Sequence, residues 1–460
     1  MEIQVAGAGA GKTTTMAQKV IELREQCDES KIIFCITFTN NAVECINKKL
    51  LEHYKIIPQN IVISTIHSFL YNELIKPYYF LLYKKHYKKI SVIDLPNDVK
   101  AKNYKLSKLE NTDQLHQTSI PERAKWVIYK KSNDTANIKR NRTIINNTLK
   151  EYIGAICIDE AQDVDKDMKL IIEAFDSLDI PLYLMGDPKQ DLRGYGCFRE
   201  IVNNNIVNNN NDSTHYSNNC YRCPQKHLLL SNQLISKSEQ QISQKSMGEL
   251  LVYYESETNC KELINMYNYD LVYISKKQGA FETHNFTSKV QINESVADEI
   301  IVAMKHNHPK TSDILIQKAS YYYAQILLAK YQECNDKKRA MRDTFKLENL
   351  GSNYYASIIN SIPDKIERKN DCILLNSIES IKGKEGHNCL FILTSDLASY
   401  LFSKKTEENK TKNKLYVALT RSLENLTIFI TSDVENKYGK EKIISFFKMF
   451  TEKSNELPAQ

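Results

Sequence analysis

The stretch Ala6-Gly7-Ala8-Gly9-Ala10-Gly11-Lys12-Thr13 follows the apolar run Ile3-Gln4-Val5 and precedes a helical stretch from Thr14 to Glu22. A strand, a glycine-rich loop and a helix in this order are typical of a phosphate-binding loop. Glycines let backbone N–H groups close around a phosphate, and the helix N-terminus presents the positive end of its dipole. Lys12 is expected to reach the β- and γ-phosphates, and Thr13 to offer its hydroxyl to Mg²⁺. The sequence therefore predicts a nucleoside triphosphate site.

An acidic pair after a second predicted strand supplies the rest of the chemistry that such a site needs. The apolar run Ile153–Ile158 predicts a buried parallel strand, which ends directly before Asp159-Glu160-Ala161-Gln162. At the carboxyl end of this strand, Asp159 is expected to hold Mg²⁺ through water, and Glu160 to polarise the attacking water as a general base. Together with the glycine-rich loop, the acidic pair predicts hydrolysis of the nucleotide rather than binding alone.

The composition is typical of a soluble globular protein. With 460 residues, 42% of them apolar and 26% charged, the chain is long enough for two to four domains. No run approaches the length of a membrane span and the amino terminus does not resemble a signal peptide, so we expect a cytoplasmic protein without a membrane partner. Cys220 and Cys223 form one C-x-x-C without a second pair at zinc spacing. Four other cysteines are expected as reduced core residues: Cys35, Cys157, Cys372 and Cys389.

Positive charge is concentrated in one segment. Between Lys76 and Lys150 there are 17 Lys and Arg against 6 Asp and Glu, a net charge of +11, whereas the whole chain carries +6. The segment also contains eight large aromatics: Tyr78, Tyr79, Phe80, Tyr83, Tyr87, Tyr104, Trp126 and Tyr129. Basic groups with interleaved aromatics suit a nucleic-acid backbone and its bases. A solvated lysine-rich helical face with its aromatics in the core explains the composition equally well, and both interpretations stay open.

Eight stretches along the chain, in this order, resemble the motifs of the UvrD/PcrA/Rep branch of superfamily 1 DNA helicases. They are Ala6–Thr13, Thr37–Ala42, Thr65–Phe69, Asp159–Gln162, Gly186–Gln190, Tyr221–Arg222, Ser380–Glu385 and Tyr416–Arg421. The resemblance extends over most of the chain. It implies an α/β fold of two RecA-like P-loop NTPase domains in tandem, each an open parallel sheet flanked by helices, with ATP and Mg²⁺ held between them.

The resemblance also implies which residues form the nucleotide site. The nucleotide-binding set is Ala6, Gly7, Ala8, Gly9, Ala10, Gly11, Lys12, Thr13, Thr14, Tyr221, Arg222, Glu385 and Arg421. The catalytic set is Lys12, Glu160, Gln190, Arg222 and Arg421, and the metal is held by Thr13 and Asp159. Arg222 and Arg421 are expected to reach the γ-phosphate from the second domain, where their fixed charge stabilises phosphoryl transfer. Tyr221 would stack on adenine, Glu385 would bond the ribose, and Gln190 would sense the γ-phosphate.

A single DNA strand is expected to cross both domains. Phe38 and Tyr195 match positions that stack on bases in the family, a contact that tolerates any base. The positions that match contacts to the DNA backbone are Thr37, Thr65, His67 and Lys382. Such a site binds phosphates and base faces and does not select a sequence.

The chain departs from the pattern of its relatives in three short stretches. The glutamine motif before the first strand is missing, and Thr14 stands where relatives often carry an adenine-packing Arg, which leaves the preferred nucleotide open. Within Asp191–Cys197, Arg193 replaces an aromatic residue and Gly196 replaces an Arg. Glu379 occupies the position of a DNA-contacting His, and a carboxylate there repels phosphates unless it is paired.

The resemblance implies the following division of the chain. Residues 1–75 and 151–215 form the two parts of the first RecA-like domain, and residues 76–150 form a short basic helical insertion between them. Residues 216–460 form the second domain, with a reduced insertion around 286–370. A full-size second insertion is therefore not expected.

The course of the second insertion is open between two interpretations. In the first, a helix at Glu294–Lys305, a strand at Asp313–Ile316 and a helix at Tyr321–Tyr331 belong to the core of the second domain. In the second, Leu271–Ser275 is the core strand, and the helix, strand and helix form a reduced insertion.

Two further segments have distinctive patterns. The asparagine-rich run Asn203–Asn211 has neither a helical nor a strand period, and it predicts a solvated loop between the two halves. The end of the chain, Val434–Gln460, predicts one amphipathic helix with a frayed end.

Two functions share this set of motifs. The first is an ATP-driven translocase and helicase on single-stranded DNA, moving 3′ to 5′ as its relatives do, including a stand-alone repair helicase. The second is a regulatory ATPase that senses DNA ends and controls a partner enzyme. The reduced insertions are similar to those of the helicase-like subunit of the Gabija anti-phage system, which works beside an OLD-type nuclease, so such a nuclease is the expected partner. A nucleotide-binding module without turnover is disfavoured because every catalytic position is intact.

Overall fold

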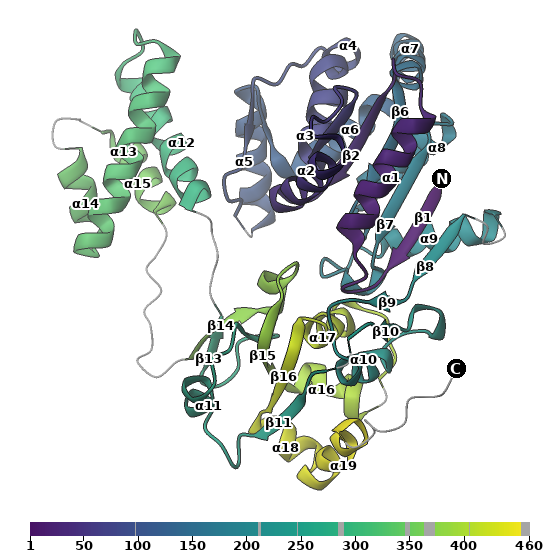
Figure 1. Cartoon of the computed structure of the whole chain (residues 1–460). Coiled ribbons are helices and arrows are strands. Elements are labelled where there is room, and N and C mark those ends of the chain that lie inside the picture. Colours follow the sequence, from purple (N-terminus) through teal and green to yellow (C-terminus); the bar gives the residue numbers. More distant parts are fainter. Residues whose placement is uncertain are drawn as a thin grey trace. The chain divides into compact units, whose positions relative to one another are not determined.

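The computed structural model describes residues 1–96, 98–209, 213–245, 247–283, 289–345, 350–362, 373–403 and 405–451. The chain forms two compact units, and most of their helices and strands are labelled in Figure 1. The large unit is formed by Met1–Lys84, Pro121–His284 and Asp371–Gln460, and the small unit by Lys85–Ile120 and Asn285–Asn370. Each unit therefore combines segments that are far apart in the sequence.

The first lobe of the large unit is built on a six-stranded parallel sheet in the order β3-β2-β6-β7-β1-β8. Its strands are β1 (Glu2–Ala6), β2 (Ile32–Thr37), β3 (Ile61–Thr65), β6 (Ile153–Ile158), β7 (Leu182–Gly186) and β8 (Thr214–Ser217). Its longer helices are α1 (Lys12–Gln26), α2 (Asn40–Tyr54), α7 (Ala136–Tyr152), α8 (Lys166–Ser177) and α9 (Cys197–Asn209). Strand β6 is buried along its full length, as expected for a parallel strand that is covered on both faces.

The second lobe is built on another six-stranded parallel sheet, in the order β11-β16-β15-β12-β14-β13. Its strands are β11 (Leu250–Tyr254), β12 (Leu271–Ile274), β13 (Phe281–Thr283), β14 (Ile373–Ser377), β15 (Gly386–Leu393) and β16 (Ser422–Ile430). Its helices are α10 (Gln225–Asn232), α11 (Cys260–Met266), α16 (Ser395–Phe402), α17 (Lys410–Leu419), α18 (Ser432–Tyr438) and α19 (Lys440–Thr451). Two parallel sheets flanked by helices confirm the predicted α/β fold of tandem RecA-like domains.

The small unit consists of two segments. The first contains β4 (Lys89–Ser91), α5 (Val99–Asn111) and β5 (Gln114–His116), and the second contains α12 (Lys289–Asn307), α13 (Asp313–Cys334), α14 (Lys337–Thr344) and α15 (Ser352–Ser361). Helices α12 to α15 share one apolar core, which includes Ile300, Leu327 and Met341. Two ion pairs join the segments: Lys89 Nζ lies 3.6 Å from Asp298 Oδ1, and Lys105 Nζ lies 4.0 Å from Glu299 Oε1.

The structure decides between the two interpretations of the second insertion. Strand β12 lies in the second sheet between β15 and β14, so the interpretation with Leu271–Ser275 as the core strand is confirmed. The predicted strand at Asp313–Ile316 is wrong, because these residues form the first turn of α13. The Ser312 side chain accepts a hydrogen bond from the Leu315 N–H at 3.4 Å and caps that helix. The predicted domain boundaries stay a prediction.

Two other predictions about local structure are wrong. Most of the asparagine-rich run is helical, since α9 extends to Asn209; Asn210 and Asn211 lie outside the described residues. The α9 side chain of Asn205 is buried and donates to the hydroxyls of Ser213 and Thr214, both at 2.9 Å. The predicted single helix at the end of the chain is two helices, α18 and α19, because Gly439 between them has a φ of 81°. Residues 452–460 lie outside the described part.

The expected core cysteines are found where the structure describes them. Cys35, Cys157 and Cys389 are buried and free, and Cys372 lies outside the described residues. Within the described ranges, no helix is both long and apolar enough to cross a membrane.

A buried ion pair joins the helices that connect β3 to β6. From β3 the chain passes through α3 (Ile66–Phe69), the π-helix η1 (Leu70–Tyr79) and α4 (Phe80–Tyr83), and it returns through α6 (Ile120–Ile128) to α7. Arg142 of α7 donates to Asp134 Oδ2 at 2.7 Å, to the Tyr83 hydroxyl at 2.9 Å and to the Trp126 carbonyl at 3.1 Å. Asp134 and Arg142 are both buried.

We expect Asp134→Ala to lower the free energy of unfolding by about 3 to 5 kcal/mol, because it leaves the Arg142 guanidinium buried without its carboxylate. Urea denaturation followed by circular dichroism measures the change. Lys150→Ala is the control, since it breaks an ion pair with Asp179 that is largely exposed, and we expect it to leave the urea midpoint unchanged. Equal midpoints for the two variants would contradict the prediction.

Candidate functional site

The glycine-rich loop between β1 and α1 requires glycine where its backbone is left-handed. Gly9 and Gly11 have φ values of 69° and 77°, in the region that side chains disfavour. A Cβ on Gly9 would lie 2.4 Å from Arg222 Cβ and 3.0 Å from Cys220 Sγ. Because Arg222 belongs to the second lobe, this glycine also allows the two lobes to meet at the loop. The first turn of α1 follows with Lys12, Thr13 and Thr14.

The positive charge of Lys12 acts on both carboxylates of the acidic pair. The Lys12 Nζ lies 3.5 Å from the Ala6 carbonyl and 3.4 Å from the Gly7 carbonyl. Asp159 is buried at the carboxyl end of β6, and burial and then the Glu160 carboxylate raise the pKa of Asp159 to about 7. Burial also acts to raise the pKa of Glu160, but the positive charges of Lys12 and Lys382 outweigh it and bring that pKa below its usual value.

Glu160 is held in an unusual backbone conformation. Its φ is 55°, which is uncommon for a residue with a side chain, and such residues cluster at functional sites. Gln162 donates to the Glu160 carboxylate through Nε2 and accepts the Asp187 N–H through Oε1, the latter at 3.0 Å. Gln162 therefore joins the loop after β6 to the loop after β7.

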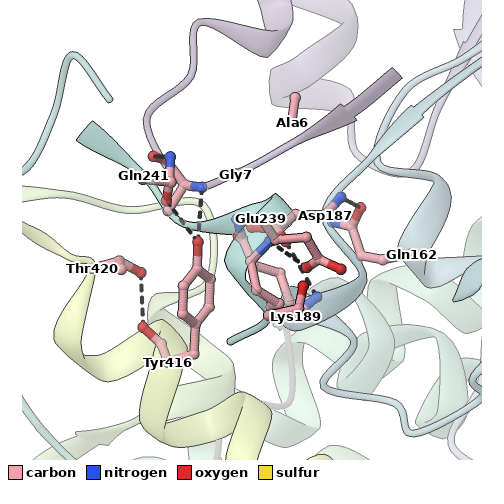
Figure 2. Close-up of polar contacts among 12 residues, drawn as sticks. Ala6, Gly7, Gln162, Asp187, Lys189, Glu239, Gln241, Tyr416 and Thr420 are labelled. Atoms are coloured by element: carbon pink, nitrogen blue, oxygen red, sulfur yellow. Dashed lines mark hydrogen bonds and ion pairs between the residues drawn. The ribbon is translucent and has the colours of Figure 1, made fainter. Parts of the chain in front are cut away.

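A buried charged network, which the sequence analysis did not identify, extends from the end of β7. Gln190 Nε2 donates to Asp187 Oδ2 at 2.8 Å, and Lys189 Nζ lies 2.9 Å from Asp187 Oδ1. The same Lys189 Nζ bonds Glu239 Oε2 at 2.8 Å, and Arg199 pairs with Glu239 Oε1 at 2.9 Å. Figure 2 shows Lys189 between the Asp187 and Glu239 carboxylates. Gln190, a predicted catalytic residue, is thus fixed by this network.

The second lobe contributes two arginines with very different surroundings. Arg222 Nε pairs with Glu385 Oε2 at 2.6 Å, and the Tyr221 N–H donates to the Gly9 carbonyl at 2.8 Å. Arg421 is 1% exposed and donates to the carbonyls of Val417 (3.0 Å) and Lys384 (3.3 Å).

Among the described residues, no carboxylate lies within ion-pair distance of Arg421. Burial, and then the positive charge of Arg222, lower the pKa of Arg421 to about 10. Arg421 is therefore a buried cation without a paired carboxylate in the part of the chain that the structure describes.

The second lobe also binds the backbone of the glycine-rich loop directly. The Ala8 N–H donates to the Tyr416 hydroxyl at 3.2 Å, and Gln241 Nε2 donates to the Ala8 carbonyl at 2.9 Å. The Tyr416 hydroxyl donates to Gln241 Oε1 at 2.8 Å. Tyr416 begins the last helicase-like motif, but no local pattern in the sequence points to Gln241.

Four of the predicted DNA-binding residues lie at one edge of the first sheet. Thr37 and Thr65 are register partners at the carboxyl ends of β2 and β3, and Phe38 and His67 follow them in the chain. The Thr37 hydroxyl is buried without a hydrogen-bond partner among the described residues, whereas His67 is exposed. Tyr195 is 41% exposed in the loop after Gln190.

Lys382 of the second lobe is bonded to the first lobe. Its Nζ lies 2.6 and 2.7 Å from the two Asp163 carboxylate oxygens, just after the acidic pair. This pairing gives Lys382 a structural contact in addition to the DNA contact that the sequence predicts.

The departures from the family pattern have local structural explanations. Glu379, the predicted source of repulsion, pairs with Lys414 at 2.6 Å and with Lys410 at 3.8 Å. In the loop after Gln190, the Asp191 carboxylate accepts the N–H groups of Gly194 (2.7 Å) and Gly196 (2.8 Å). Both glycines have positive φ values, so the loop is a tight turn in which an Arg at position 196 would be strained.

Comparison with known proteins agrees with the motif pattern. Residues 3–144 match the family model of the UvrD/REP helicase N-terminal domain. Gabija protein GajB of Bacillus cereus (strain VD045) is 27% identical over 245 residues, which are 52% of this chain and 48% of that protein. ATP-dependent DNA helicase Rep of Buchnera aphidicola subsp. Schizaphis graminum (strain Sg) is 26% identical over 229 residues, 41% of this chain and 34% of that protein.

The chain thus spans about half and about a third of the lengths of these two relatives. Among solved structures, a complex of Arterivirus nonstructural protein 10 (helicase) with DNA covers 95% of this chain and 62% of its own. Its identity is 11% and its TM-score is 0.38, which is too low to support an argument. The family match and the two relatives confirm the predicted resemblance to UvrD/Rep helicases.

Proposed function

We propose that this chain is a DNA-dependent ATPase of the helicase type. In this proposal it binds single-stranded DNA and couples ATP hydrolysis, with Mg²⁺, to translocation or unwinding in the 3′ to 5′ direction. The observation that carries the proposal is the placement of Arg421. A guanidinium that is 1% exposed and has no paired carboxylate among the described residues is costly unless an anion binds beside it. A triphosphate on the glycine-rich loop, which Arg222 approaches at Gly9, would be such an anion.

The residues of the first lobe suit a nucleotide with a magnesium ion. The loop from Ala6 to Gly11 offers backbone N–H groups at the start of α1, and Lys12 adds a positive charge. Thr13, in the first turn of α1, and Asp159, at the carboxyl end of β6, offer the oxygen ligands that Mg²⁺ prefers. When bound, the ion neutralises the charge that develops on the phosphates.

We assign the following roles to the catalytic side chains, and their contacts support each assignment. Glu160, whose carboxylate is kept ionised by Lys12 and Lys382, accepts a proton from the attacking water. Gln190, whose side-chain amide is held by Asp187, senses the γ-phosphate. Arg222 and Arg421 stabilise the transition state from the second lobe, and Tyr221, which is 59% exposed beside Gly9, offers its ring to the base. Glu385 would bond the ribose after its ion pair with Arg222 breaks.

The DNA strand is proposed to cross the sheet edge formed by Thr37, Phe38, Thr65 and His67, and to reach Tyr195 and Lys382. Helix α5 of the small unit is a second candidate for DNA binding, considered by itself. Its Lys100, Lys102 and Lys108 are exposed beside Tyr104, which is 73% exposed. A lysine-rich helix with an exposed aromatic ring favours the nucleic-acid interpretation of the basic segment over the solvated one.

A subunit that acts with a nuclease is the form of this function that we favour. The match to Gabija protein GajB supports it, and the predicted partner is an OLD-type nuclease in anti-phage defence. The similar match to ATP-dependent DNA helicase Rep supports the alternative of a stand-alone helicase. A third form is a DNA-end-sensing ATPase with little unwinding of its own.

Catalysis is tested by two substitutions with matched controls. Lys12→Ala and Glu160→Gln should each lower the rate of ATP hydrolysis with single-stranded DNA by at least about a hundredfold, because each removes a charge from the reacting centre. Lys19→Ala, on the same helix as Lys12, and Glu173→Gln on α8 should hydrolyse ATP at the wild-type rate. Wild-type turnover by either variant would overturn the catalytic role proposed for that residue, and absence of hydrolysis by the wild-type chain would overturn the ATPase function.

A strand-displacement assay distinguishes a stand-alone helicase from a subunit that unwinds little DNA by itself. On a duplex with a 3′ single-stranded tail, a stand-alone helicase should unwind the duplex with ATP and Mg²⁺ at a rate that follows its ATPase rate. DNA-stimulated hydrolysis with negligible unwinding would favour the subunit. A duplex with a 5′ tail is the control for direction, and preferential unwinding of it would contradict the proposed 3′ to 5′ polarity.

Helix α5 is tested by the salt dependence of DNA binding. The triple variant Lys100→Ala, Lys102→Ala and Lys108→Ala should bind single-stranded DNA more weakly, and the slope of log K against log salt should fall by about 2. Fluorescence anisotropy with a labelled oligonucleotide measures it. The control is Lys85→Ala with Lys88→Ala, because both lysines pair with Asp113, at 2.7 and 3.1 Å, and this carboxylate offsets part of their charge. An unchanged slope in the triple variant would favour the solvated interpretation.

A further inference from the structure

Three hydrogen bonds form a closed ring between the glycine-rich loop and the second lobe. The Ala8 N–H donates to the Tyr416 hydroxyl, that hydroxyl donates to Gln241, and the Gln241 amide donates back to the Ala8 carbonyl. Figure 2 shows the Tyr416 hydroxyl pointing to the loop, with the Gln241 amide beside it. Ala8, Tyr416 and Gln241 are all at most 1% exposed. Both polar backbone groups of one loop residue are therefore satisfied by the second lobe.

The loop is shaped to receive this ring. A Cβ on Gly7 would lie 2.3 Å from Gln241 Cδ, closer than any real contact, so only glycine allows the amide to approach. The ring needs every one of its bonds, because removing one partner leaves a buried donor or acceptor unsatisfied. Such a contact is costly to break and is not a chance approach of two surfaces.

The ring is connected to both Arg421 and the network around Gln190, the two groups that are proposed to act on the γ-phosphate. Tyr416 lies on α17, and the Arg421 guanidinium is bonded to the Val417 carbonyl of the same helix. Gln241 follows the Glu239 carboxylate by two residues, and Glu239 holds Lys189, the neighbour of Gln190 in the chain. The Lys189 ammonium also lies 5.4 Å from the centre of the Tyr416 ring.

We propose that Tyr416 and Gln241 are positioning residues for nucleotide hydrolysis. They bind the phosphate-binding loop from the second lobe and so fix the distance between that loop and the helix that precedes Arg421. Neither side chain needs to touch the nucleotide, because each acts through the Ala8 backbone. This inference rests on the proposed ATPase function, but the ring itself exists in the nucleotide-free chain and can be tested there.

The first test measures the ring without nucleotide. In hydrogen exchange followed by mass spectrometry, Tyr416→Phe should speed exchange in peptides that contain Ala8 by at least about tenfold, because the amide loses its acceptor. Tyr273→Phe is the matched control. Tyr273 is equally buried and its hydroxyl donates to the Ala418 carbonyl of the same helix at 2.7 Å, but it makes no bond to the loop. An unchanged exchange rate at Ala8 in Tyr416→Phe would show that the hydrogen-bonded ring does not exist.

The second test measures the positioning effect. Tyr416→Phe and Gln241→Ala should each lower kcat for ATP at least about fivefold while KM changes less than about twofold, since the loop still binds phosphate and only the arginine is displaced. The double variant should be no slower than the slower single variant, because either change opens the same ring. Tyr273→Phe should keep the wild-type kcat.

The outcomes distinguish this inference from the function on which it rests. Independent, additive losses in the double variant, or a larger KM with an unchanged kcat, would contradict a positioning role. Lower thermal stability with normal turnover in Tyr416→Phe would reduce the ring to a structural contact. If the wild-type chain neither hydrolyses ATP nor binds a fluorescent ADP analogue, the proposed function fails, while the exchange experiment still decides whether the ring exists.

Discussion

The contact between Gly9 and the second lobe is the constraint on which the site depends. The Gly9 carbonyl accepts the Tyr221 N–H, and the space where a Cβ would lie is filled by Arg222. A side chain at this position would separate the lobes, and Arg222 could no longer stand beside the loop. The same close approach allows Tyr416 and Gln241 to bond Ala8. Because Gly9 has no side chain, the two lobes can approach closely enough to form these polar contacts.

Two buried charged groups of the large unit have opposite surroundings. Lys189 lies between the carboxylates of Asp187 and Glu239, and Arg199 completes the network. Burial acts to raise the pKa of Asp187, but Lys189 and Lys12 hold it below its ordinary value. Arg421, in contrast, has only carbonyl and hydroxyl partners among the described residues. This contrast between satisfied and unsatisfied charge is the physical basis of the proposed nucleotide site.

Much of the fold and of the first lobe's part of the site could be predicted from the sequence because the signals are local. A strand, a glycine-rich loop and a helix are contiguous, and an acidic pair marks the carboxyl end of the buried strand β6. Gln241 could not be predicted, because it lies in an irregular segment and meets Ala8 only through the tertiary fold. The helix α9 was missed for a related reason. Its asparagines have low helix propensity, but Asn205 bonds residues beyond the helix, and this bonding outweighs propensity.

The small unit has a consequence for how the chain is made. Its two segments, Lys85–Ile120 and Asn285–Asn370, are joined by ion pairs from Lys89 and Lys105 to α12, yet the sequence between them belongs to the large unit. During synthesis, which proceeds from the amino terminus, the first segment leaves the ribosome well before its partner exists. A nascent chain that stops after the first lobe therefore exposes an unpartnered, positively charged helix. The small unit can assemble only after α15 has been translated, when β14, β15 and β16 of the second lobe are still to come.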